Sequence, residues 1–227
     1  ATYSHFSECE LHRTFSDEDA QVCSRFLPGA LTEAYAQGRS WIEGEYRRMD
    51  EQGNVTWVSS TVNLIVEPTT RALLVYYINR NIDKRRRWEL SLPQKVERDT
   101  LTMLYTRDTT EALVTYLLQS RKHQLANCFL AIVEINSFTQ IAEEMGQEAA
   151  NQGHFSVCRI LRNLLDQDCV VGQLSTEKIL LFWPDMTSSA KLRNLLMNSV
   201  KAIGKVREIS GLLKPFYFTV GISGVQS

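Results

Sequence analysis

The side chains best suited to metal or thiol chemistry are five cysteines and four histidines, and they are scattered along the chain. No two cysteines form a C-x-x-C pair, the spacing typical of structural zinc sites. We therefore expect no structural zinc, and we interpret the cysteines as buried thiols in a reducing cytosol. The residues concerned are Cys9, Cys23, Cys128, Cys158, Cys169, His5, His12, His123 and His154.

A run of four basic residues, Lys84 to Arg87, could bind phosphate or nucleic acid. However, acids flank the run, and the 227-residue chain has 25 Lys and Arg against 26 Asp and Glu, a formal net charge of −1. A near-neutral chain argues against broad electrostatic binding to nucleic acid. We interpret the run as the solvated face of a linker helix and expect no nucleic-acid partner.

The elements that must position these residues fall into two groups, so we expect two domains. In the first, Ser16 to Asp19 resembles a capping box that starts a helix, Pro28 should split that helix, and Gly38 should end it. Strand-like runs at 41–49, 55–66 and 72–79 are separated by short turns, which predicts an antiparallel meander. No apolar run approaches the ~20 residues of a membrane span, and we expect a cytoplasmic protein.

The second group follows a break near residue 98. Its pattern predicts strands at 128–135, 169–174, 178–183 and 216–222, and helices at 107–122, 138–145, 152–166 and 188–209. From the first strand onward the order is β-α-α-β-β-α-β, which predicts a ferredoxin-like sheet with helices on one face. The expected fold class is therefore α+β.

The first group resembles a PAS sensor domain. Gly44 to Asp50, followed by Gly53 to Val58, is similar to the family's "EYR…dG…W" strand-turn-strand, and Asn81 to Asp83 stands where the family has an Asp-Ile-Thr motif before a signalling helix. The resemblance implies a truncated PAS-like domain over 1–83 and a linker helix over 84–98. Its aromatic side chains could line a ligand pocket or pack the sheet; Cys23 and His12 are the nearby candidates for a cofactor contact.

The second group resembles a GGDEF domain over 99–227, with its C-terminal end missing. Asp99 to Arg107 is similar to the family's opening motif, Phe129 to Phe138 to its "D-I-D-x-F" strand, and Thr219 to Ser223 to a late strand. Active members condense two GTP molecules into cyclic di-GMP across a dimer, with Mg²⁺ or Mn²⁺ held by two carboxylates. From the residues alone, Asp99 could cap a helix entered at Leu101, and Arg107 could pair with it.

The resemblance implies that Glu134 and Glu177 stand at the metal positions and are the catalytic candidates if the domain is active. Ser175 and Thr176 replace both glycines of the signature hairpin, and Lys178 replaces its fourth, acidic residue. The alternative interpretation makes Glu134 a partly exposed acid at a strand end and Glu177 a turn residue.

The nucleotide-binding positions also depart from the family pattern. Ala142 stands in place of an Asn that contacts guanine, Asn151 in place of an Asp that does so, and Gln147 in place of a His. Asn136 replaces the second Asp of the "D-I-D" strand. The segment Asp166 to Cys169 does not form the R-x-x-D motif of the product-inhibition site. Asn151, Ser175 and Thr176 are therefore the candidate nucleotide contacts.

Three functions follow from this pattern. The first is a degenerate, non-catalytic GGDEF domain that acts through homodimerisation, or through nucleotide sensing passed to other signalling domains or proteins. The alternative is a divergent diguanylate cyclase that uses Glu134 and Glu177 with GTP and Mg²⁺ or Mn²⁺. The third is an interaction scaffold that binds no nucleotide.

Overall fold

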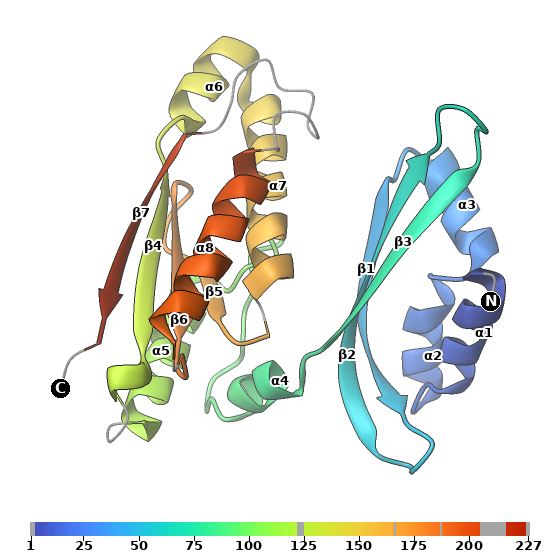
Figure 1. Cartoon of the computed structure of the whole chain (residues 1–227), viewed down its shortest axis with the longest axis horizontal. Helices are drawn as coiled ribbons and strands as arrows, with labels where there is room; N and C mark the ends of the chain where they lie inside the picture. The colour runs from blue at the N-terminus through green and yellow to red at the C-terminus, as the bar shows by residue number, and fades with distance from the viewer. Residues whose placement is uncertain (1–2, 122–124, 166, 187, 205–216, 226–227) are drawn as a thin grey trace. The chain divides into compact units, whose positions relative to one another are not determined.

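The structure, a computed structural model, describes residues 3–121, 125–165, 167–186, 188–204 and 217–225. The chain divides into two compact units, Ala1–Arg86 and Arg87–Ser227 (Figure 1). Among the described residues, no helix is long and apolar enough to cross a membrane.

The first unit is a three-stranded antiparallel sheet with one face covered by helices (Figure 1). Its strands, in sheet order, are β1 (Trp41–Met49), β2 (Val55–Val66) and β3 (Leu73–Asn81), which confirms the predicted meander. The helices are α1 (Tyr3–His12), α2 (Asp17–Ser24) and α3 (Pro28–Ala36). Tyr46, Val62 and Phe26, each at most 1% exposed, lie in the core between the two layers.

The helix signals of the first unit act as expected. Ser16 caps α2, because its hydroxyl oxygen accepts a hydrogen bond from the Asp19 amide at 3.3 Å. Pro28 begins a separate helix, α3, so the predicted helix is split there. Burial opposes ionisation of the Asp19 carboxyl, but hydrogen bonds from Ser16 and Arg47 outweigh it and hold its pKa below the usual value.

Helix α4 (Asp83–Leu90) begins in the first unit and ends in the second. The expected linker helix over 84–98 was therefore too long. Pro93 lacks an amide hydrogen and keeps the preceding Leu92 out of the helical region, so a helix cannot continue through this segment.

The second unit is a mixed α/β domain on a four-stranded antiparallel sheet of order β5-β6-β4-β7. Its strands are β4 (Phe129–Ile135), β5 (Val170–Gln173), β6 (Lys178–Trp183) and β7 (Phe218–Gly224). Its helices are α5 (Arg107–Ser120), α6 (Phe138–Met145), α7 (Gln147–Leu165) and α8 (Ser189–Gly204), with a 3-10 turn at Leu125–Asn127. Residues 122, 166, 205–209 and 216 of the predicted elements lie outside the described residues.

Helices cover both faces of this sheet, which corrects the expectation of helices on one face. Val133 and Ile135 pack in one core with residues of α6, α7 and α8. Leu180 and Phe182 pack in another with Leu113 of α5. Strand β6 is buried on both faces, so its side chains do not alternate between polar and apolar. Its continuous apolar run is the sequence signal of this double coverage.

The segment before α5 also differs from the prediction. Asp99 does not cap a helix at Leu101; its Oδ1 atom accepts hydrogen bonds from the Leu101 and Thr102 amides at 3.1 and 2.7 Å in a turn. Arg107 is the first residue of α5 and pairs with Glu111 at 2.8 Å, not with Asp99. Short polar side chains favour such local turns as readily as helix caps.

Buried His154 on α7 makes the stability of the second unit pH-dependent. Its side chain is 2% exposed and lies 3.4 Å from the Cys158 sulfur and edge-on to Phe138. Burial lowers the pKa of His154 below 6.5, against the opposing influence of the Asp99 carboxylate. The unfolded chain therefore binds this proton at a higher pH than the folded chain does.

We expect the free energy of unfolding to fall as the pH drops below about 6.5. Urea denaturation at pH 7.5, 6.5 and 5.5 measures the slope, and His154→Gln should remove this residue's part of it. An unchanged slope in the variant would show that other groups cause the pH dependence.

Candidate functional site

The hairpin between β5 and β6 carries two of the three candidate nucleotide contacts, Ser175 and Thr176. The Leu174 and Ser175 amides both donate to the Lys178 carbonyl, at 2.8 and 3.2 Å, and the Lys178 amide donates back to the Ser175 carbonyl at 3.3 Å. Ser175 and Thr176 are exposed. Among the described residues, the non-glycine positions with positive φ are Arg71 and Met103. Ser175 and Thr176 therefore form this turn without the left-handed backbone conformation that favours glycine.

Glu134 is ion-paired with the residue that replaces the acidic signature position. Glu134 on β4 lies opposite Lys178 on β6, and the Lys178 Nζ atom is 3.3 Å from the Glu134 Oε1 atom. Both side chains are about half exposed, at 43% and 49%, so the pair contributes at most about 1 kcal/mol to stability. Its main local effect is that the Lys178 ammonium group offsets the negative charge of the Glu134 carboxylate.

Glu177 is held from a different element. Its Oε1 atom accepts a hydrogen bond from the Thr139 hydroxyl at 2.8 Å, and Thr139 lies on α6. Its backbone carbonyl accepts from the Ile135 amide at 2.8 Å. The structure thus brings the Glu177 backbone next to β4, while its carboxylate and that of Glu134 have different partners.

These residues fit a divalent metal poorly. Carboxylate oxygens suit Mg²⁺, but the Glu134 carboxylate already faces a cation. Among the described residues, no group of three or more His, Cys, Asp or Glu side chains could hold a metal ion.

The predicted guanine-reading positions lie on α6 and α7. Helix α7 begins at Gln147, five residues before the predicted start, so Gln147 and Asn151 lie one turn apart on the same helix. The Gln147 Nε2 atom donates to the Asn151 Oδ1 atom at 3.0 Å, so one of the two lone pairs of this oxygen is already used. Ala142 is partly buried against the core of the second unit and offers no polar atom.

The remaining departures are Asn136 and the segment Asp166 to Cys169. Asn136 donates from its Nδ2 atom to the Thr219 hydroxyl of β7 at 2.8 Å. In the segment that lacks the R-x-x-D motif, Asp168 is exposed, Cys169 is buried, and Asp166 lies outside the described residues. Sequence reasoning missed Thr139 and Thr219, because a threonine at a helix start or on a strand gives no signal of a partner far along the chain.

The comparisons identify the second unit. The second unit is a mixed α/β domain whose four-stranded antiparallel sheet has helices on both faces and Glu177 in its β5–β6 hairpin. The family model "Diguanylate cyclase, GGDEF domain" matches residues 96–227, more than half of the chain. The chain therefore belongs to the GGDEF family.

Solved structures agree with this fold. The GGDEF domain of TpbB (YfiN) from Pseudomonas aeruginosa is 18% identical with a TM-score of 0.51, and the match covers 56% of this chain and 74% of that one. The GGDEF domain of DgcB from Caulobacter crescentus, solved with c-di-GMP, is 13% identical with a TM-score of 0.50, covering 57% and 77%. At these identities the likeness concerns the fold alone. No curated protein sequence matches the chain.

Proposed function

We propose that the second unit is a degenerate GGDEF domain that serves cyclic di-GMP signalling without making the dinucleotide. The observation that carries the proposal is the Lys178–Glu134 ion pair, which places a cation at a position where catalysis would need a metal ligand. Ser175 and Thr176 add side chains to the turn that a nucleotide would approach, and Ala142 removes a base contact. An unpaired polar group in a base-reading site costs on the order of 1–3 kcal/mol.

We further propose that the first unit is a PAS-like input module and that the chain acts as a homodimer or through a partner protein. The meander, the Gly44 to Asp50 strand and the Asn81 to Asp83 segment before α4 support this assignment. Helix α4 supports a role in passing a signal from the first unit to the second, because each of its ends is bonded to one unit. The Asp83 Oδ1 atom accepts from the Trp57 amide at 2.8 Å in the first unit, and the Glu89 carboxylate pairs with Arg98 at 2.8 Å in the second.

Product analysis tests the catalytic state. The purified chain, incubated with GTP and Mg²⁺ or Mn²⁺, is expected to yield no cyclic di-GMP above the background of a Glu177→Ala variant. Formation of the dinucleotide that this variant abolishes would refute the proposal and favour the divergent cyclase that uses Glu134 and Glu177.

A Lys178→Glu variant tests the physical reason. Reversing this charge frees Glu134 and adds a third carboxylate, so Mn²⁺ should bind about tenfold more tightly by calorimetry in the presence of GTP. Lys191→Glu, an exposed charge reversal on α8, is the matched control. Equal affinities in the wild type and both variants would show that Lys178 does not block the position.

A further inference from the structure

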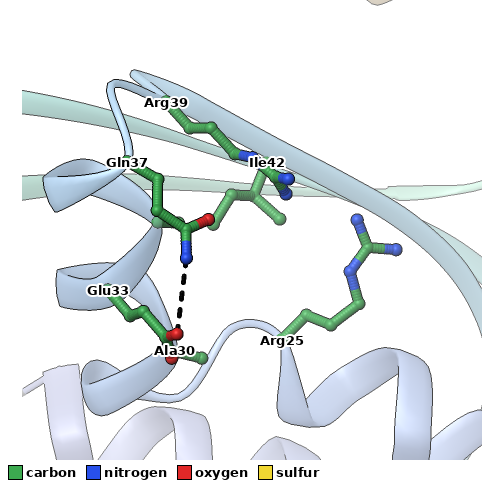
Figure 2. Close-up of a pocket in the computed structure, with 7 residues that line it drawn as sticks. Arg25, Ala30, Glu33, Gln37, Arg39 and Ile42 are labelled. Carbon is green, nitrogen blue, oxygen red and sulfur yellow. Dashed lines mark hydrogen bonds between the residues drawn. The ribbon is translucent and has the colours of Figure 1, made fainter.

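A hollow in the first unit lies between α3, the C-terminal end of α2 and the start of β1 (Figure 2). Its volume is about 240 Å³, below the roughly 300–1,000 Å³ of sites for drug-sized ligands, so it suits a small metabolite. Ala30, Ala34 and Ile42 form its apolar part, and the last two are only 7% and 6% exposed. The floor is therefore set by the core of the unit.

Two guanidinium groups, those of Arg25 and Arg39, line this hollow. Figure 2 shows Arg39 reaching over it from the loop before β1, and Arg25 from the end of α2. Neither guanidinium has an ion pair or hydrogen bond with any residue in the described part of the chain. Other arginines of the unit do have partners: Arg47 pairs with Asp19 at 2.9 Å, and Arg48 with Glu10 at 3.2 Å.

The backbone fixes where Arg39 stands. Gly38 has φ +81°, its amide donates to the Tyr35 carbonyl at 2.9 Å, and the Arg39 amide donates to the Ala34 carbonyl at 3.0 Å. These two bonds form a Schellman motif, which turns the chain back over the end of α3. These hydrogen bonds thus fix the Arg39 backbone at the rim of the hollow.

Glu33 on α3 is the one acid among the residues that line the hollow. The Glu33 Oε1 atom accepts a hydrogen bond from the Gln37 Nε2 atom at 3.3 Å, drawn dashed in Figure 2. Together with two guanidinium groups, this carboxylate gives the rim a formal charge of +1. Guanidinium groups bind a carboxylate, and a carboxylate binds an ammonium group. The rim therefore favours a ligand that carries both an anionic and a cationic group.

We propose that this hollow binds a small α-amino acid, with its carboxylate on Arg25 and Arg39 and its ammonium group on Glu33. The two arginines account for the anionic end, and the Glu33 carboxylate disfavours phosphates and other multiply charged anions that lack a donor. The regulatory meaning of such binding rests on the proposed role of the first unit as an input module. Binding itself depends on neither GTP nor the second unit.

Thermal shift of the full chain against the twenty proteinogenic L-amino acids tests the proposal, followed by titration calorimetry with the strongest. Acetate and inorganic phosphate at equal ionic strength are the comparison probes. Arg39→Gln and Glu33→Gln should each weaken binding of the amino acid about tenfold. Arg193→Gln, which removes an exposed arginine on α8, should leave it unchanged.

Three results would overturn the proposal: no binding by any of the twenty, affinity for acetate or phosphate equal to that for the best amino acid, or full affinity in Glu33→Gln. Because the readout is binding, its failure would leave the cyclic di-GMP measurement unaffected. The converse also holds, since production of the dinucleotide by the chain would not alter the calorimetry.

Discussion

Replacing Gly172 by alanine is expected to lower the free energy of unfolding of the second unit by about 3 kcal/mol. A Cβ atom added to Gly172 on β5 would lie 1.9 Å from the Thr110 Oγ1 atom and 2.5 Å from its Cγ2 atom. Thr110 cannot easily move, because it is fully buried on α5 and its hydroxyl donates to the Thr106 carbonyl at 2.7 Å. The added Cβ atom must therefore push β5 and α5 apart.

Urea denaturation followed by circular dichroism measures this loss. Gly29→Ala on α3 is the control, because nothing lies within 4 Å of the added Cβ there and its φ is ordinary. The double variant Gly172→Ala with Thr110→Ala should regain part of the loss, since it removes the two nearest atoms. Strictly additive effects of the two substitutions would contradict the steric explanation.

The contact between Gly172 and Thr110 shows which parts of the fold can be predicted from the sequence and which cannot. A glycine within an apolar strand signals a close approach, and the run around Gly172 was predicted as a strand. The partner is 62 positions earlier on a helix, and no local pattern names Thr110. The predicted placement of helices on one face was wrong for the same reason, because an apolar run does not tell which helix covers its second face.

The candidate site follows the same division. The β5–β6 hairpin and the position of Glu177 in its turn could be predicted from spacing and resemblance. The Lys178–Glu134 pair could not, because it depends on the register between β4 and β6, strands more than 40 residues apart. Likewise, the Gln147–Asn151 bond exists only because α7 starts earlier than its apolar periodicity indicates.

A buried polar cluster joins the end of α4 to the start of the GGDEF domain. The Glu89 side chain is 8% exposed, and its Oε1 atom accepts from the Tyr105 hydroxyl at 2.7 Å and from the Arg98 Nη2 atom at 2.8 Å. The Arg98 guanidinium also lies 4.0 Å above the Tyr105 ring and donates to the Met103 carbonyl at 2.8 Å. Glu89 is the shared acceptor of this cluster.

Removing that acceptor should have the second large effect on stability. In Glu89→Ala, the Tyr105 hydroxyl and the Arg98 charge lose their shared partner in a buried setting, so we expect a loss of about 3 kcal/mol. Tyr105→Phe should cost only about 1 kcal/mol, because it removes one hydrogen bond and leaves the ion pair. Glu111→Ala, which breaks the exposed pair with Arg107, should cost less than about 0.5 kcal/mol. Equal losses for Glu89→Ala and Glu111→Ala in urea denaturation would show that burial gives the cluster no added weight.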